Sequence, residues 1–188
     1  YTGYVLTPGH IGDTGKDGTG EIIVSAGGGA VGFATLPKIF NLRNKVAIRD
    51  FPWRFVTGPH MPPEIFNELS AKETNDTFVE RSRPDLPAVI SRAKLSISQA
   101  GYNTIAELMN AGTPAVVVPY EGGVETEQRL RSDLLAKRSL LQVVDENELN
   151  VNNLNNAIYQ ALNTKPVKKL NVSLDGASST ANLLWALL

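Results

Sequence analysis

Glycines gather at one point of the chain where the backbone could bind an anion. Residues 27–32 read Gly-Gly-Gly-Ala-Val-Gly, which matches the pattern G-x-G-x-x-G, and they directly follow an apolar run over 21–26. Gly27, Gly28 and Gly29 would let the backbone approach a phosphate, and the N-terminus of a following helix would add N–H donors and positive partial charge. A tight strand-to-helix turn that needs positive φ explains the same glycines without any ligand.

Two common versions of a phosphate loop do not fit this chain. A dinucleotide site needs an acid at the end of the next strand to hold a ribose, but the residues there are Thr57-Gly58-Pro59-His60. A P-loop needs a glycine five residues before Gly15, where the chain has His10, and a hydroxyl after Lys16, where it has Asp17. The sequence therefore disfavours NAD and P-loop binding of a nucleotide, and we expect no cofactor.

A second candidate loop follows the apolar run 95–98. Gly101 is expected to form a turn, and a helix is expected to begin at Asn103 or Thr104. Thr104 and Glu107 have the spacing of a capping box, which stabilises a helix without any ligand. A first-turn carboxylate can cap a helix and still accept hydrogen bonds from a bound hydroxyl, so both interpretations stand.

A third polar segment follows the apolar run 115–118. Residues 119–128 read Pro-Tyr-Glu-Gly-Gly-Val-Glu-Thr-Glu-Gln, which places Glu127 and Gln128 just inside the next helix. A solvated first turn, favoured by the helix dipole, explains these acids equally well.

Six short apolar runs must position these loops. Their near-continuous apolar character indicates strands buried on both faces, and segments with helical spacing lie between them. The alternation predicts one α/β domain over 1–188, a doubly wound parallel sheet of the Rossmann-like kind, in which ligands bind beyond the carboxyl ends of the strands. The predicted strands span 21–26, 53–57, 77–79, 95–98, 115–118 and 141–144.

The remaining segments give three further expectations. Residues 1–20 are predicted to hold an opening strand, Tyr1–Leu6, followed by a glycine-rich mobile loop over 7–20. In the helix expected over 124–137, Leu130, Leu134 and Leu135 mark an apolar stripe for the core. Gly112, followed by a proline two residues later, is expected to end the helix that begins near Thr104.

Composition excludes several classes of function. Eighteen Lys and Arg against nineteen Asp and Glu leave a net charge of −1, which argues against nucleic acid as a partner. The absence of cysteine and the presence of only two histidines exclude thiol catalysis and a multi-histidine metal site. No apolar stretch approaches the roughly 20 residues of a membrane helix, and no signal peptide opens the chain. The sequence does not begin with Met, as expected of a piece of a longer protein.

Residues 95–140 resemble the C-terminal, nucleotide-sugar-binding half of GT-B glycosyltransferases, especially the family 28 group that includes MurG. The motifs occur in that family's order along nearly the whole chain. They are S-A-G-G-G-A-V-G, T-G-P, S-x-x-G-x-N-T-x-x-E, A-G-x-P, V-P and E-Q.

The resemblance implies that a UDP-linked sugar lies with its diphosphate over the two glycine loops. The residues matched to the first loop are Gly27, Gly28 and Gly29, and those matched to the second are Gly101, Asn103 and Thr104.

The same resemblance implies roles for five other residues. Glu107 matches the acid that holds the ribose hydroxyls. Glu127 and Gln128 match the pair that holds the donor sugar. Phe78 and Val79 match the place where backbone groups contact the pyrimidine. The chain departs from MurG at Tyr4-Val5-Leu6, where an arginine is missing, and in the loop over 121–123, which is one residue longer, so the identity of the sugar stays open.

The resemblance also implies what this chain lacks. In the family an N-terminal domain supplies the acceptor site and the general base, so we expect no catalytic residue here and an inactive domain when alone. The closing helix, 177–188, is expected to cross back towards that other half. A cytoplasmic location is expected, with any membrane association made through the N-terminal domain. Two alternatives stay open: a nucleotide-sugar hydrolase or epimerase of the same fold, and one subunit of a split glycosyltransferase.

Overall fold

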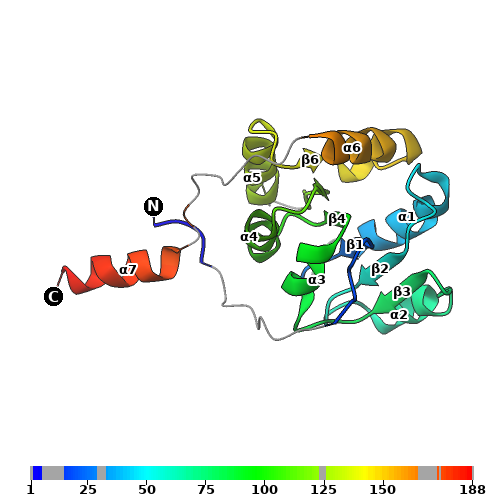
Figure 1. Ribbon diagram of the computed structural model, residues 1–188, viewed down its shortest axis with the longest axis horizontal. Helices are drawn as coiled ribbons and strands as arrows, with labels where there is room; N and C mark the ends of the chain where they lie inside the picture. The colour runs from blue at the N-terminus through cyan, green and yellow to red at the C-terminus, as the bar shows by residue number, and fades with distance from the viewer. Residues whose placement is uncertain are drawn as a thin grey trace.

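Six parallel strands form one sheet, which lies between helices in the globular part of the molecule (Figure 1). The computed structural model describes residues 2–5, 15–28, 33–122, 126–164, 173 and 175–187. All six predicted strands are present, and the order β3-β2-β1-β4-β5-β6 confirms the doubly wound α/β fold. The strands are β1 (Ile22–Ser25), β2 (Trp53–Val56), β3 (Thr77–Glu80), β4 (Leu95–Ser98), β5 (Ala115–Val117) and β6 (Gln142–Val143).

Helices cover both faces of the sheet, as the buried apolar strands require (Figure 1). One face packs against α1 (Thr35–Leu42), α2 (Pro63–Ser70) and α6 (Val151–Asn163), and the other against α3 (Leu86–Arg92), α4 (Tyr102–Ala111) and α5 (Glu127–Ala136). Two short 3-10 helices, η1 (Arg43–Lys45) and η2 (Glu146–Glu148), complete the sheet domain.

The strand order reverses between β1 and β4. From β1 the chain builds the sheet outward through β2 and β3, and it then crosses to the other side of β1 to begin β4. Ser25 and Ser98 lie opposite each other at the carboxyl ends of these two neighbouring strands. The two predicted glycine loops therefore leave the sheet side by side, at the switch point where open α/β sheets bind their ligands.

The start of α4 corrects one prediction. The helix begins at Tyr102 with Gly101 as its N-cap, and no side chain caps it. Thr104 therefore occupies the third helical position, so Thr104 and Glu107 do not form a capping box. The extended backbone of Gly101, with ψ 151°, starts the helix earlier than expected. The other end agrees with the prediction, because Gly112 ends the helix with φ +68°.

The apolar stripe expected on α5 is also wrong. Leu130 and Leu134 are 62% and 45% exposed, and only Leu135 of the three is buried. The buried face of the helix instead carries Leu135 and Ser132, whose hydroxyl donates to the Gln128 carbonyl. Polar contacts of α5 with the neighbouring loops, described below, set this rotation of the helix.

The first described residues do not form the expected opening strand. Val5 makes an isolated antiparallel bridge with Asp175, outside the six-stranded sheet. The Tyr4 backbone N–H donates to the Ser173 carbonyl over 2.8 Å, and its carbonyl accepts from Gly176 N–H over 2.9 Å. Residues 7–14 of the predicted glycine-rich loop, and Leu6 of the predicted strand, lie outside the described residues.

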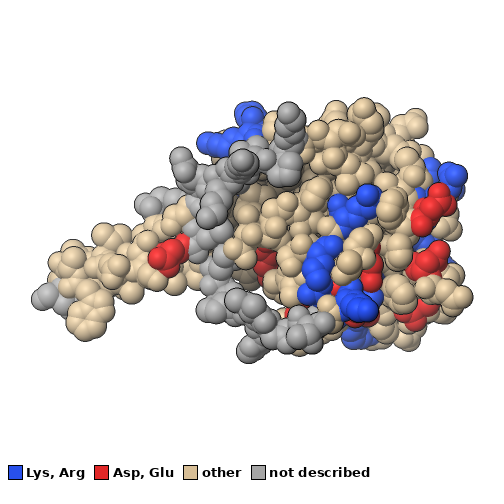
Figure 2. Space-filling view, in the orientation of Figure 1, with Lys and Arg blue, Asp and Glu red and all other residues tan. Residues whose placement is uncertain are grey.

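The last helix, α7 (Gly176–Trp185), extends away from the sheet domain (Figure 1). It carries no charged side chain, and Leu183, Leu184 and Trp185 are exposed on it. On the sheet domain, by contrast, basic and acidic side chains are interspersed over the face shown in Figure 2. No helix in the described part of the chain combines the length and the apolar character needed to cross a membrane.

Candidate functional site

The two glycine loops meet at the hydroxyl of Thr104. A Cβ atom placed on Gly27 would lie 3.4 Å from Thr104 Oγ1, and one placed on Gly101 would lie 3.9 Å from the same atom. A hydrogen bond of 3.2 Å from Gln99 N–H to the Ser25 carbonyl joins the two loops at their base. The structure thus brings together the two segments that the sequence analysis assigned to one ligand.

Gly27 and Gly28 differ in what the backbone requires of them. Gly27 has φ +60°, a conformation that glycine adopts without strain and other residues rarely adopt. Gly28 has no positive φ, is exposed, and would have no atom within 4 Å of an added Cβ. A tight turn therefore explains Gly27, but it does not explain Gly28. Gly29 lies outside the described residues.

The N-terminus of α4 offers polar groups that the described part of the chain does not use. No side chain caps the first turn, where the positive end of the helix dipole lies. The Asn103 side chain is exposed, and neither its amide nor the Thr104 hydroxyl has a hydrogen-bond partner among the described residues. Such an arrangement can bind an anion through backbone N–H groups and neutral side chains.

Glu107 lies one turn after Asn103 on the same side of α4. Its carboxylate is half-buried and forms no hydrogen bond or ion pair with a described residue. Burial raises the pKa of the Glu107 carboxyl above its ordinary value. A half-buried carboxylate without a partner costs the protein stability, and a ligand that donates hydroxyl hydrogen bonds would remove that cost.

Glu127 and Gln128 lie at the start of α5 and are held in different ways. The Gln128 side-chain oxygen accepts a hydrogen bond of 3.1 Å from Tyr120 N–H, which ties α5 to the loop after β5. The exposed Glu127 carboxylate pairs with Arg131 on the next turn. Arg131 also donates to the carbonyl of Ala100, directly before the second glycine loop. The sequence analysis did not single out Arg131, although its i+4 spacing from Glu127 was a visible signal.

Phe78 and Val79 are not brought together with the glycine loops. They lie within β3, at the edge of the sheet and two strands away from β1. The Val79 N–H donates to a carboxylate oxygen of Glu73 over 2.7 Å, and the Phe78 ring lies 4.7 Å from the Arg54 guanidinium. Their predicted contact with a base therefore requires a ligand that extends along the sheet from the switch point.

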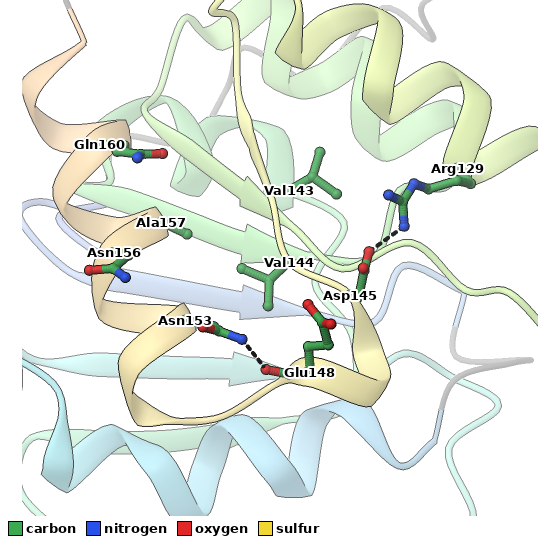
Figure 3. Close-up of a pocket in the computed structure, with 9 residues that line it drawn as sticks. All are labelled: Arg129, Val143, Val144, Asp145, Glu148, Asn153, Asn156, Ala157 and Gln160. Atoms are coloured by element: carbon green, nitrogen blue, oxygen red, sulfur yellow. Dashed lines mark hydrogen bonds and ion pairs between the residues drawn. The ribbon is translucent and has the colours of Figure 1, made fainter.

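A pocket of about 290 Å³ lies elsewhere, at the end of β6 on the other edge of the sheet (Figure 3). Arg129 and Asp145 form an ion pair at one side of it, and Asn153 donates to the Glu148 carbonyl over 2.8 Å at the other. None of the predicted site residues lines this pocket. Within the described residues, no group of acidic or histidine side chains could hold a metal ion.

The chain is similar in sequence to known proteins. Residues 28–183 match the model of the glycosyltransferase family 28 C-terminal domain. The UDP-N-acetylglucosamine–N-acetylmuramyl-(pentapeptide) pyrophosphoryl-undecaprenol N-acetylglucosamine transferase of Natranaerobius thermophilus is 37% identical over 118 residues, which are 60% of this chain and 32% of that protein. The NDP-glycosyltransferase YjiC of Bacillus subtilis is 30% identical over 145 residues, which are 76% of this chain and 34% of that protein.

Solved structures share the fold at lower identity. The chain superposes on MurG of Acinetobacter baumannii with a TM-score of 0.65 and 17% identity, covering 92% of this chain and 51% of that one. The glycosyltransferase of kitacinnamycin superposes with a TM-score of 0.63 and 18% identity, covering 98% of this chain and 43% of that one. The chain spans less than half the length of the curated relatives described here.

Proposed function

The chain belongs to the family of glycosyltransferase family 28 C-terminal domains, and we propose that it is the donor-binding domain of an inverting glycosyltransferase that uses a UDP-sugar. The observation that carries this proposal is the set of unpartnered polar groups at the switch point. Asn103, Thr104 and Glu107 lie on α4 beside the first glycine loop, and they have no partners among the described residues. A ligand with a diphosphate and vicinal hydroxyls matches them.

The diphosphate would lie over Gly28 and the first turn of α4. The open space above Gly28 lets an anion approach the backbone, and the uncapped N–H groups after Gly101 supply donors. The Asn103 amide and the Thr104 hydroxyl would add neutral donors. Because the helix dipole and the N–H groups are fixed by the fold, they need no reorganisation when the ligand binds.

Glu107 would accept hydrogen bonds from the ribose hydroxyls. Hydrogen bonds to a charged acceptor are stronger than those between neutral groups. A bound ribose would also supply the partners that the half-buried carboxylate lacks. At the other ends of the donor, Glu127 and Gln128 would contact the sugar, and Phe78 and Val79 the uracil. Contact with the Val79 N–H requires displacement of Glu73.

The acceptor and the general base would come from a second domain, preceding this one in the same protein. The chain has only two histidines, His10 and His60, and neither lies within the two glycine loops. We therefore expect the chain alone to bind a UDP-sugar weakly and to transfer nothing, since a donor enclosed between two domains loses many contacts when one is removed. Transfer catalysed by this chain alone would contradict the proposal.

The test is a calorimetric titration of the 188-residue chain with UDP, uridine and a panel of UDP- and dTDP-sugars. We expect binding of UDP and UDP-sugars, and weaker binding of uridine. Preference for dTDP-sugars would overturn the uracil assignment, and no binding of any of these ligands would overturn the donor site. Release of free sugar from a UDP-sugar by the chain alone would instead support a hydrolase.

A further inference from the structure

Arg131 connects the two segments that the proposed donor site needs. Its side chain is only 13% exposed, although it pairs with Glu127, whose side chain is 74% exposed. One guanidinium nitrogen donates to the Ala100 carbonyl over 3.2 Å, and another pairs with the Glu127 carboxylate. The guanidinium also lies over the ring of Tyr102, the first residue of α4, 5.4 Å from its centroid.

These three contacts fix the guanidinium in one place. A planar guanidinium can donate in two directions and stack on an aromatic ring at the same time, which a lysine ammonium cannot do. The Ala100 carbonyl and the Tyr102 ring both belong to the second glycine loop and the start of α4. The position of the Glu127 carboxylate, which is otherwise 74% exposed, is thereby tied to the predicted phosphate site.

The negative charge of Glu127 would oppose binding of a diphosphate, and Arg131 neutralises that charge. A carboxylate near a diphosphate repels it, and this repulsion acts over several ångströms because the Debye length is about 8 Å at physiological salt. Paired with Arg131, the acid keeps its hydrogen-bonding oxygens but contributes no net charge at this end of α5. An acidic side chain can therefore contact a neutral sugar without weakening the binding of the anion beside it.

We propose that Arg131 is a positioning residue of the donor site, which holds Glu127 beside the second glycine loop and neutralises its charge next to the donor diphosphate. This inference rests on the proposed function. It assigns to Arg131 no contact with the donor itself. Its effect on UDP binding is exerted through Glu127, and that dependence distinguishes it from a direct phosphate ligand.

The test compares Arg131→Gln, Glu127→Gln and the double variant by calorimetric titration with UDP and with uridine. Arg131→Gln removes the cation that pairs with the Glu127 carboxylate, so UDP affinity should fall by about threefold to tenfold at low salt, and the loss should shrink in 0.5 M salt. Uridine carries no phosphate, and its affinity should not change. Glu127→Gln, made in the Arg131→Gln background, should restore most of the UDP affinity.

The matched control is Arg138→Gln. Arg138 is exposed and follows α5, and among the described residues it donates only to the Leu134 carbonyl of that helix, over 2.9 Å. Removing it changes the net charge by the same amount without touching Glu127. We expect no more than a small, salt-sensitive change in UDP affinity for this variant.

Four results of these titrations would support or overturn the proposed role of Arg131. Recovery of UDP affinity in the double variant supports the proposed role. UDP affinity that stays low in the double variant shows that Arg131 binds the phosphate directly and overturns it. Parallel losses for uridine and UDP, with a lower melting temperature, show a purely structural role and also overturn it. No UDP binding by the unsubstituted chain overturns the donor site, and with it the role of Arg131.

Discussion

Two polar regions of the sheet domain differ in how their side chains are paired. Beside β2 and β3, the Arg54 cluster comprises Arg54, Glu21, Glu80, Asp17 and Arg83. Arg54 is 5% exposed and pairs with Glu21 over 2.7 Å and with Glu80, while Arg83 pairs with Asp17 over 2.7 Å. At the switch point, by contrast, Asn103, Thr104 and Glu107 have no partners among the described residues.

The contrast separates residues that stabilise the fold from residues available to a ligand. In the Arg54 cluster the buried cation and its acids satisfy one another, and the cluster fixes residues 17–21 against the sheet. At the switch point the polar groups gain nothing from the described part of the chain. Charge and burial alone would select the Arg54 cluster as the candidate binding site. Whether the polar groups are paired with one another therefore distinguishes a binding site from a structural cluster better than charge or burial does.

The largest effect is expected from breaking the paired region. Arg54→Ala leaves Glu21, which is 8% exposed, as a buried acid without its cation, and the free energy of unfolding should fall by about 3–5 kcal/mol. Urea unfolding measures this loss. Arg49→Ala is the control, because Arg49 is exposed and its pairing with Asp50 spans 3.8 Å. A loss in the control as large as that in Arg54→Ala would contradict the assigned role of the cluster.

The next effect is on ligand binding at the unpaired region. Glu107→Gln replaces an ionised acceptor by a neutral one, so affinity for UDP should fall by about 1.5–3 kcal/mol, or roughly ten- to a hundredfold. Stability at neutral pH should not fall, because the substitution removes a half-buried charge that has no partner among the described residues. Calorimetry and a thermal melt of one sample measure both quantities. A lower melting temperature with unchanged UDP affinity would assign Glu107 to the fold.

Substitutions in the first glycine loop should have smaller effects, on stability at Gly27 and on ligand binding at Gly28. Gly27→Ala should cost roughly 1 kcal/mol of stability, because alanine is strained at φ +60°. Gly28→Ala should leave the melting temperature unchanged, since its Cβ meets no atom within 4 Å. It should lower the affinity for UDP and leave the affinity for uridine unchanged. If Gly28→Ala lowered the affinities for uridine and UDP equally, this loop would not be part of the phosphate site.

The smallest effects are expected in the pH dependence, and they have opposite signs. The hydrogen bond from Arg83 lowers the pKa of Asp17, so Asp17 stabilises the fold above its ordinary value of 3.8 and this contribution is lost as the pH falls through the lowered value. Burial raises the pKa of Glu107, so stability decreases as the pH rises from 4.5 through the raised value.

Asp17→Asn and Glu107→Gln test these signs by unfolding in urea between pH 3 and pH 7. Relative to the unsubstituted chain, Asp17→Asn should lose more stability near neutrality than in acid. Glu107→Gln should gain stability near neutrality and change little in acid. The same sign for both variants would contradict the contrast between the two regions.

The fold could be predicted from the sequence because each strand is an apolar run and each loop carries a turn residue. The strand ends and Gly112 follow from such local chemistry. The predicted stripe on α5 was wrong, since Leu130 and Leu134 have helical spacing, but tertiary contacts of Gln128 and Arg131 decide which face is buried. The capping box was wrong because Gly101 starts the helix without a side-chain cap.

The candidate site was predicted less completely than the fold. The glycine loops could be found from their composition and from the position of the strands before them. The absence of partners for Glu107 in the described part of the chain, like the link from Arg131 to Ala100, depends on distances between segments far apart in the sequence, which no local pattern contains. The isolated bridge between Val5 and Asp175 is of the same kind.

The β1–β4 pairing has a consequence for how the molecule opens and closes. Each half of the sheet, β3-β2-β1 and β4-β5-β6, is built from consecutive strands, and this pairing joins the two halves. Cooperative opening units often coincide with such supersecondary halves. A ligand seated across the two loops binds only when the halves are docked, so it opposes their separation by mass action. A ligand bound across the two loops should therefore slow amide hydrogen exchange along Ile22–Ser25 and Leu95–Ser98, compared with the free protein.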